Sequence, residues 1–454
     1  MKSHPDNARN AALAVLNRLD KGGETLDAVL DDAREDVFHW DKREKALLNA
    51  LVYGVLRNRA RLDWVIGRFS KTPLKKIESQ VLNILRIGLY QITDLDRIPV
   101  SAAVNTSVEM AKRNAAPWVP RFVNAVLRNA SRNQGRAAPP DMAKDPLISL
   151  SISASFPEWL ITRWIDRFGF CETEAMCRFL NTIPPITLRT NTLKTSRESL
   201  LEAMVEEAAD ARATPYSPEG IFLTGPKKPL FEMPSFKKGL FQVQDEAAQL
   251  VTRLLAPEPG QAVLDACAGL GGKTGYIAQL MNDTGRLTAA DMDVHRLFQL
   301  EKEMERIGVT IAATRAVDLS KAREVASFPR FDRILIDAPC SGLGVIRRNP
   351  DIKWRMIPEH LLRLSKNQGR LLANLSERVK PGGLLVYTVC SLEPEETVDV
   401  ADAFLRENPG FTLDADWDEV SISANPFKSD KGYFRTVPYV HHMDGFFSAR
   451  FRKH

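Results

Sequence analysis

The second half of the chain alternates short apolar runs with stretches of helical periodicity, and this alternation restricts the fold more than any other feature. The apolar runs predict strands near residues 262–265, 286–290, 333–336 and 384–388. The stretches between and after them predict helices near 274–282, 294–307, 359–379 and 395–406. Such alternation is typical of a parallel sheet with helices on both faces. We therefore predict a Rossmann-like α/β domain over residues 236–454, with one more edge or antiparallel strand at 444–451.

The first part of the chain predicts helices and no convincing strand. Apolar residues recur at helical spacing within residues 12–19, 47–56 and 81–89. An all-α bundle is expected over residues 1–138, followed by a linker at 139–149 that the Gly and paired Pro residues near its start indicate.

A third region separates the bundle from the α/β domain. Ile186–Thr190 and the apolar segment at 221–223 predict strands, and residues 196–207 predict a helix. We expect a small mixed α/β domain over residues 150–235, which makes the chain a multidomain protein.

Composition sets the broad class. A chain of 454 residues exceeds the roughly 250 to 300 residues that one core supports. No window approaches the about 20 apolar residues that cross a bilayer, and the N-terminus lacks the apolar core of a signal peptide. We expect a cytoplasmic chain without a membrane partner. Its five cysteines include no C-x-x-C pair, so they should be reduced thiols, and no metal site is predicted.

Positive charge gathers in one segment. The net charge of +5 is small, but residues 112–140 carry six basic side chains and no acidic one, with Trp118 and Phe122 among them. The segment could bind phosphates. A run of basic residues more commonly forms a solvated helix face, and these residues are compatible with either phosphate binding or a solvated face.

A glycine-rich turn follows the first strand of the α/β domain. Gly269, Gly271 and Gly272 let the backbone approach a ligand closely at the start of a helix. A P-loop would need Gly where Cys267 stands, and a dinucleotide fingerprint would need Gly where Thr274 stands, so ATP and NAD are disfavoured.

Two aspartates favour another cofactor. Asp291 follows the next strand, where a carboxylate can accept hydrogen bonds from ribose hydroxyls, and Asp318 follows the segment after that. Either one alone would more often cap a helix or a turn. Together with the glycine turn they favour S-adenosyl-L-methionine, which carries a ribose and an adenine but no phosphate.

Two cysteines follow the last two predicted parallel strands. Cys340 stands in Asp-Ala-Pro-Cys-Ser and Cys390 in Tyr-Thr-Val-Cys-Ser. A lone cysteine is usually a small buried hydrophobe, as we expect for Cys171 and Cys177. A thiolate at the end of a strand, however, is a strong nucleophile, and a pyrimidine C5 becomes reactive once a thiolate has added at C6.

With these features the chain resembles the Sun/Fmu-type (RsmB-like) small-subunit ribosomal RNA cytosine-5 methyltransferases with a fused NusB-like domain. The resemblance covers nearly the whole length. It is carried by the segments 121–129, 188–192, 242–246, 271–274, 337–341, 344–354, 380–383 and 444–447. Two departures stand out: the family commonly has Ala-Pro where Gly269 and Leu270 stand, and Thr where Val389 stands.

The resemblance implies roles for individual residues. Cys390 would add to C6 of a cytosine in ribosomal RNA, Cys340 would assist release of the enzyme, and Asp337 would act at the cofactor and at the cytosine ring. Cofactor contacts would come from Cys267, Ala268, Gly269, Leu270, Gly271, Gly272, Lys273, Asp291, Asp318 and Asp337. RNA contacts are expected from Arg347, Arg348, Lys353, Trp354 and Arg355, and from Arg121 and Arg128 in the basic segment. We expect a monomer.

Two rival functions compete with this one. A methyltransferase acting on an amino group usually has an aromatic residue after the strand that Asp337 ends, and this chain has Cys340 there. An RNA-binding assembly protein without catalysis would not need both thiols, the acidic residues and the glycine turn.

Overall fold

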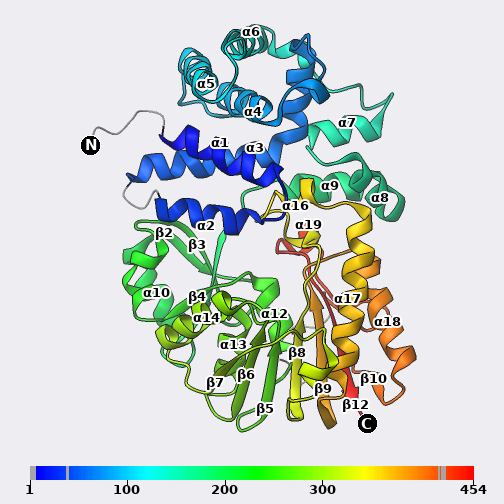
Figure 1. Ribbon diagram of the computed structural model, residues 1–454. Helices are drawn as coiled ribbons and strands as arrows, with labels where there is room; N and C mark the ends of the chain where they lie inside the picture. Colours follow the sequence, from blue (N-terminus) through cyan, green and yellow to red (C-terminus); the bar gives the residue numbers. More distant parts are fainter. Residues whose placement is uncertain (1–6, 37–39, 418–419, 421–425) are drawn as a thin grey trace. The chain divides into compact units, whose positions relative to one another are not determined.

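The computed structural model describes residues 7–36, 40–417, 420 and 426–454, and it forms two compact units (Figure 1). Unit 1 comprises Met1–Thr182 and Arg348–Met356, and unit 2 comprises Ile183–Arg347 and Ile357–His454. The chain therefore returns briefly to unit 1 just after the Cys340 segment. This division differs from the predicted boundaries, which placed residues 150–182 with the small mixed domain.

Unit 1 is helical, as predicted. Its helices are α1 (Asn7–Asp20), α2 (Leu26–Asp36), α3 (Lys42–Phe69), α4 (Ser79–Asp94), α5 (Val100–Asn114), α6 (Val119–Arg132), α7 (Pro146–Ser153), α8 (Glu158–Phe168), α9 (Phe170–Leu180) and the short α16 (Ile352–Arg355). Apolar residues at helical spacing, such as Leu48, Val52 and Val55 of α3, meet in one buried core. Asp41 caps α3 by accepting hydrogen bonds from the backbone N–H groups of Arg43 and Glu44.

Unit 2 begins with a small antiparallel sheet in the order β2-β3-β1-β4. Its elements are β1 (Ile186–Thr190), α10 (Arg197–Glu207), β2 (Ala208–Ala213), β3 (Gly220–Pro226), α11 (Pro234–Lys237) and β4 (Phe241–Val243). Leu188, Met204 and Phe241 are buried between the sheet and α10. The predicted strand at 186–190 and the predicted helix at 196–207 are both present.

The larger sheet of unit 2 has the order β10-β12-β9-β8-β5-β6-β7, and β11 pairs with β12. Its strands are β5 (Ala262–Ala266), β6 (Arg286–Asp291), β7 (Ala312–Ala316), β8 (Phe331–Asp337), β9 (Val379–Val389), β10 (Phe411–Leu413), β11 (Phe434–Arg435) and β12 (Phe447–Lys453). The helices are α12 (Glu246–Arg253), α13 (Gly272–Leu280), α14 (Val294–Ile307), α15 (Ala322–Val325), α17 (Pro358–Ser376), α18 (Val398–Glu407) and α19 (Pro438–His441). Strands β5 to β9 are parallel, and β12 pairs antiparallel with β9, as predicted for the C-terminal strand.

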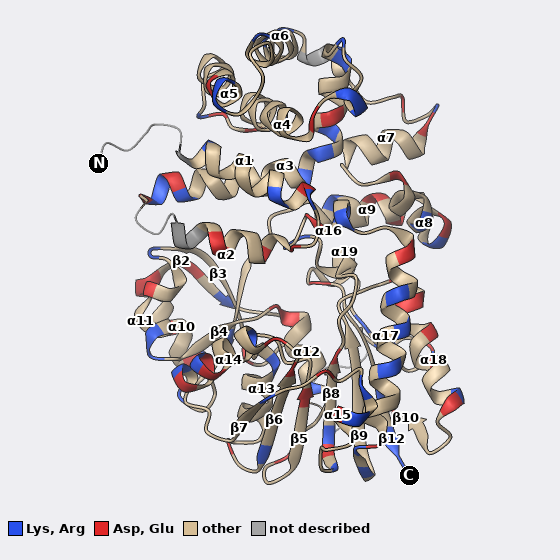
Figure 2. Cartoon of the chain, viewed as in Figure 1, with Lys and Arg blue, Asp and Glu red and all other residues tan. Residues whose placement is uncertain are grey.

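Alternate side chains of the central strands pack on opposite helical layers. Ile334 and Ile336 of β8 share one core with α17 and α18, and Leu335 between them shares the other with α12, α13 and α14. The strands are mostly tan in Figure 2, which reflects their uncharged middles. Burial on both faces explains why these strands read as continuous apolar runs, and it confirms the Rossmann-like α/β fold.

Two features of unit 2 differ from the predicted elements. Strand β7 was not predicted, because its sequence Ala-Ala-Thr-Arg-Ala is half-exposed and carries few β-branched residues. The strand predicted near 384–388 begins earlier, at Val379, so that β9 includes Lys380–Gly383. Among the described residues, no helix is long and apolar enough to span a bilayer.

Candidate active site

The carboxyl ends of four parallel strands bring the predicted site residues to one edge of the sheet. Strand order runs from β5 through β6 to β7 in one direction and from β8 to β9 in the other. Open α/β sheets bind ligands at such a switch point, outside the carboxyl ends of the strands. The glycine turn follows β5, Asp291 ends β6, Asp337 ends β8 and Cys390 directly follows β9.

The two thiols lie in contact at this edge. The Sγ atoms of Cys340 and Cys390 are 3.2 Å apart, although the residues stand fifty positions apart in the chain. The pKa of Cys340 is raised well above the usual thiol value, first by its hydrogen bond with Cys390 and then by burial, with the carboxylate of Glu396 adding to the effect. Cys340 is therefore protonated at neutral pH and can donate a hydrogen bond to the Cys390 sulfur.

A glycine fixes the approach of the two cysteine loops. The backbone N–H of Gly344 donates to the carbonyl of Cys390 at 3.0 Å, and the Gly344 carbonyl accepts from Gly445 at 2.9 Å. A Cβ atom at residue 344 would lie 1.9 Å from the Gly445 oxygen, so only glycine fits. The contact joins the Cys390 loop to two segments that carry the family resemblance, 344–354 and 444–447.

The glycine turn bends through left-handed backbone conformations. Cys267, Gly269 and Gly271 have φ angles of 62°, 56° and 83°. A side chain at Gly271 would also collide with Leu300 of α14, 2.6 Å from its Cβ position. Burial raises the pKa of the Cys267 thiol, which suits the backbone contact, rather than a chemical role, expected of this residue.

The Asp291 carboxylate is tied to the glycine turn. Its Oδ2 accepts a hydrogen bond from the Gly269 N–H at 2.9 Å, and its Oδ1 accepts one from the Asp293 N–H at 3.0 Å. Each oxygen keeps a second lone pair that can accept from a ribose hydroxyl. The Asp291 carboxylate is held in one orientation beside the glycine turn, and the turn lacks a phosphate-binding motif. Both features suit S-adenosylmethionine, which has a ribose but no phosphate.

Lys273 and Asp337 connect the turn with the cysteine edge. The Lys273 Nζ lies 2.6 Å from Asp337 Oδ2, and the Lys273 side chain is largely buried whereas that of Asp337 is partly exposed. Burial opposes the charged form of Lys273, but its pKa is nevertheless raised, because Asp337, Asp265 and Cys390 favour the cation. One lysine therefore holds the Asp337 carboxylate in place and supplies positive charge next to Cys390.

Asp265 was assigned no role from the sequence. It is fully buried in β5, and burial raises its pKa to about 7 although Thr274 donates a hydrogen bond to it at 2.6 Å.

Asp318, which was predicted to contact the cofactor, accepts hydrogen bonds within its own turn. The hydroxyl and backbone N–H of Ser320 donate to its Oδ1, and the hydroxyl contributes most to holding the pKa of Asp318 below its usual range.

Arg189 of β1 is a further residue whose role the sequence did not reveal. Its fully buried guanidinium donates to the Gly272 carbonyl at 2.7 Å and to the side-chain oxygens of Gln242 and Gln244. It also stacks on Tyr276, 4.6 Å from the ring centroid. Burial lowers the pKa of Arg189 to about 10, so it stays charged at neutral pH. The small sheet thus holds the start of α13, where the glycine turn ends.

Replacing Arg189 with methionine should destabilise unit 2 by about 3 kcal/mol, because three buried acceptors lose their donor. Urea unfolding of the purified chain measures this change. Arg212→Met is the control, since Arg212 is exposed on the same sheet and should shift stability by less than about 0.5 kcal/mol. Equal stability of the two variants would contradict the anchoring role.

One predicted RNA contact is wrong. Lys353 is fully buried in unit 1, where its Nζ donates to the carbonyls of Arg57 and Ser155 and to Asn181 Oδ1 at 3.0, 2.8 and 3.0 Å. Trp354 packs on the helical core and donates its indole N–H to the Leu56 carbonyl at 2.7 Å. The Lys353 ammonium is therefore enclosed and cannot reach a phosphate, whereas Trp354 is half-buried with its indole N–H already paired.

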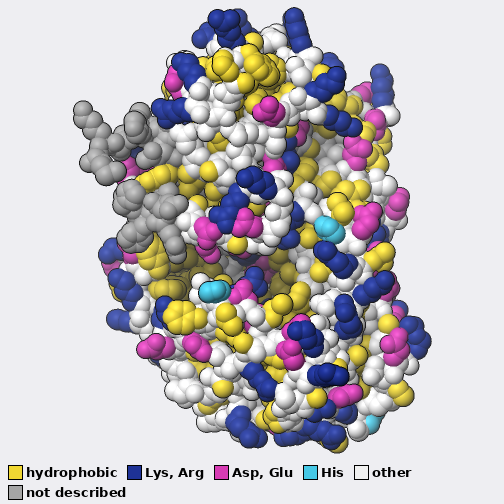
Figure 3. Space-filling model, viewed as in Figure 1, with side chains coloured by type: hydrophobic (Ala, Val, Ile, Leu, Met, Phe, Trp, Pro, Cys, Tyr) yellow, Lys and Arg dark blue, Asp and Glu magenta, His cyan; other side chains and the backbone are white. Residues whose placement is uncertain are grey.

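The other predicted RNA contacts vary in exposure. Arg347 is buried and donates to the Ile183 carbonyl, Arg348 is half-buried, and Arg355 is exposed beside Asp351. In α6, Arg121, Arg128 and Arg132 are exposed at a spacing that places them on one face of the helix. Lys and Arg side chains stand out at the top of unit 1 in Figure 3, where Figure 1 places α5 and α6.

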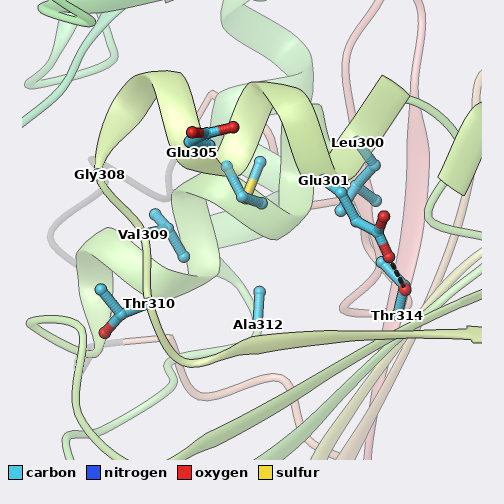
Figure 4. A pocket seen from close by; sticks show the side chains of 9 residues that line it. Leu300, Glu301, Glu305, Gly308, Val309, Thr310, Ala312 and Thr314 are labelled. Atoms are coloured by element: carbon cyan, nitrogen blue, oxygen red, sulfur yellow. Dashed lines mark hydrogen bonds between the residues drawn. The ribbon is translucent and has the colours of Figure 1, made fainter. Parts of the chain in front are cut away.

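A cavity of about 400 Å³ lies elsewhere in unit 2 (Figure 4). Its walls come from α14, the turn after it and β7, and Glu301 accepts a hydrogen bond from Thr314 at its side. Its lining includes residues 308–310 and Ala312, which precede or begin β7, and contains none of the residues predicted for the site.

Comparison with known proteins places each part of the chain. The family described as 16S rRNA methyltransferase RsmB/F matches residues 252–452, the NusB family matches 6–132, and the RsmF/B-like ferredoxin-like domain matches 156–228. The crystal structure of PH0851 superposes with a TM-score of 0.83 at 26% identity and covers 99% of both chains. A methyltransferase homolog protein from Pyrococcus horikoshii has a TM-score of 0.58 at 28% identity, over 68% of this chain and 99% of its own.

Curated relatives match over most of their length. The "Probable ribosomal RNA small subunit methyltransferase B" of Bacillus subtilis (strain 168) is 37% identical over 90% of this chain and 91% of its own. The ribosomal RNA small subunit methyltransferase B of Pseudomonas putida is 36% identical over 89% and 90%. The chain belongs to the RsmB/F family of 16S rRNA methyltransferases and uses S-adenosylmethionine as its cofactor.

Proposed function

We propose that this protein methylates C5 of a cytosine in small-subunit ribosomal RNA through a covalent adduct between Cys390 and C6 of the base. The observation that carries the proposal is the pair of thiols 3.2 Å apart at the carboxyl edge of the sheet, beside the cofactor turn. The curated relatives, which are named for small-subunit ribosomal RNA, support the substrate class. A methyltransferase acting on an amino group has no need of two adjacent thiols.

Cys390 begins the reaction by adding its thiolate to C6, which leaves C5 electron-rich enough to take a methyl group. Lys273 stabilises negative charge at this sulfur. S-Adenosylmethionine supplies the methyl group. Asp337, held by Lys273 and partly open to solvent, would accept a hydrogen bond from the cytosine amino group.

Cys340 completes the cycle. After methylation, C5 must lose its proton and the C6–S bond must break. The Cys340 thiol, 3.2 Å from the departing sulfur, protonates it as the bond breaks, and the proton from C5 restores the Cys340 thiol. Cys340 is thus restored, Cys390 is left as a thiol that loses its proton to solvent before the next turnover, and the RNA leaves with one additional methyl group.

Asp291→Ala should weaken binding of S-adenosylmethionine about 10- to 100-fold, because a charged hydrogen bond to a ribose hydroxyl contributes about 1.5–3 kcal/mol. Isothermal titration calorimetry measures the affinity. Asp293→Ala is the matched control, because Asp293 caps α14 with a half-buried side chain and should leave the affinity within about twofold. Equal affinities in the two variants would remove Asp291 from the cofactor site.

The helical unit offers a surface for the same RNA. Arg121, Arg128 and Arg132 form a basic face on α6, and Trp118 at the start of the helix is 60% exposed. Phosphates would neutralise the arginines, and a base could stack on the indole. We propose that a monomer binds its RNA partly through this face.

The test of the proposed function is direct. The full chain is incubated with small-subunit ribosomal RNA and cofactor labelled in its methyl group, and the RNA is then digested to nucleosides. Label in 5-methylcytidine is the expected result. Label on an exocyclic nitrogen would favour an amino-group methyltransferase, and RNA binding without any label would favour an assembly protein.

A further inference from the structure

Behind the two thiols lies a buried polar cluster that the reaction described above does not use. Its centre is Glu396, in the short turn that precedes α18. The cluster consists of five residues that are fully buried: Ser341, Gln368, Tyr387, Ser391 and Glu396. Buried carboxylates are costly unless they are hydrogen-bonded, so the contacts of Glu396 call for a physical reason.

The Glu396 carboxylate accepts four hydrogen bonds. Its Oε1 accepts from the Ser341 backbone N–H at 2.8 Å and from Gln368 Nε2 at 3.1 Å. Its Oε2 accepts from the hydroxyls of Ser341 and Ser391, the latter at 2.6 Å. The Tyr387 hydroxyl donates to the Glu396 carbonyl at 2.6 Å, which holds the turn itself. One side chain is therefore bonded to the residues that directly follow both cysteines.

The donors around Glu396 favour its ionised form. Ser391 Oγ accepts from the Glu393 N–H at 3.2 Å and Ser341 Oγ accepts from the Leu343 N–H at 3.4 Å, and the two hydroxyl oxygens, which both contact the carboxylate, lie 3.2 Å from each other. Burial raises the pKa of Glu396, and the donors from Ser341 and Ser391 oppose that shift. A carboxylate with four donors has each of its lone pairs occupied.

We propose that Glu396 is a positioning residue that clamps the Cys340 and Cys390 loops together and keeps their thiols at contact distance. The two loops follow different strands, β8 and β9. In each loop the serine directly after the cysteine, Ser341 or Ser391, donates a hydrogen bond to the Glu396 carboxylate. The negative charge of Glu396 also adds to the hydrogen bond with Cys390 and to burial in keeping Cys340 in its thiol form. The importance of this arrangement for methyl transfer rests on the proposed function.

The first test needs no substrate. The full chain is treated with iodoacetamide at pH 8, and mass spectrometry follows alkylation of Cys340 and Cys390 separately. Glu396→Gln keeps the size of the side chain but removes the charge and the acceptor for the serine hydroxyls. We expect alkylation of Cys340 relative to Cys390 to rise about tenfold, the effect of one pKa unit on the thiolate fraction.

The control is Asp399→Asn, which removes an exposed negative charge from α18 near Glu396 in the sequence. It should leave the alkylation ratio within about twofold. A folded Glu396→Gln protein with the wild-type ratio would overturn the proposal. If Glu396→Gln does not fold, Ser391→Ala removes one donor of the clamp and should change the ratio in the same direction, and an unchanged ratio there would also overturn it.

Methyl transfer provides the second readout. The single-turnover rate of Glu396→Gln should fall about 100-fold, with the KM for RNA and the affinity for cofactor within about threefold of wild type. A merely structural role would instead lower both affinities together with the rate. If the wild-type chain makes no 5-methylcytidine, the proposed function is wrong. The alkylation experiment tests the positioning role of Glu396 independently of that result.

Discussion

A Cys340→Ser protein is expected to transfer the methyl group and then to remain covalently attached to its RNA. The Cys390 thiolate can still add to C6, since Cys340 takes no part in that step. Release requires a proton donor at the departing sulfur, and Cys340 is the group 3.2 Å away. A serine hydroxyl is a far weaker acid than a thiol, so the adduct should persist. A denaturing gel with end-labelled RNA should show a slowly migrating protein–RNA band that contains most of the enzyme.

The adduct experiment carries its own control. The double variant Cys340→Ser, Cys390→Ser should give no such band, because the sulfur that forms the bond is missing. Cys177→Ser is a further control, since Cys177 is a buried thiol in unit 1 whose pKa burial raises. Full turnover by Cys340→Ser, without accumulated adduct, would contradict the releasing role of this residue.

Cys390→Ser should reduce methylation by at least about 10⁴-fold, which corresponds to about 5.5 kcal/mol in the activation free energy. A serine hydroxyl is almost completely protonated at neutral pH, and Lys273, the charged group beside position 390, is a cation that cannot accept its proton. The measurement is incorporation of labelled methyl groups into ribosomal RNA.

Cofactor binding serves as the internal control for this variant. Calorimetry should give an affinity for S-adenosylmethionine within about twofold of wild type, because the cofactor turn and Asp291 are untouched. Methylation by Cys390→Ser at even a tenth of the wild-type rate would exclude the covalent adduct as the route.

The sequence predicted the architecture well because β5, β8 and β9 are buried on both faces and therefore consist of continuous apolar runs. The position of both thiols at one edge of the sheet could also be predicted, because neighbouring parallel strands have their carboxyl ends on the same side. Lys353 was misassigned because a lysine among basic neighbours gives no sign that three oxygens surround it. Arg189 and Glu396 remained without a role because their partners lie up to 83 positions away, and only the folded chain brings them together.

The return of residues 348–356 to the helical unit constrains how this protein can have evolved. A helical domain attached by simple gene fusion would be joined to its neighbour by one crossing of the chain, whereas this chain passes between the units at 182–183, 347–348 and 356–357. The returning segment carries the Lys353 ammonium, whose pKa burial lowers and whose partners are all helical-unit oxygens. Removing the helical unit would leave the Lys353 ammonium without these three acceptors, so a shortened form of the chain would need a different residue at this position.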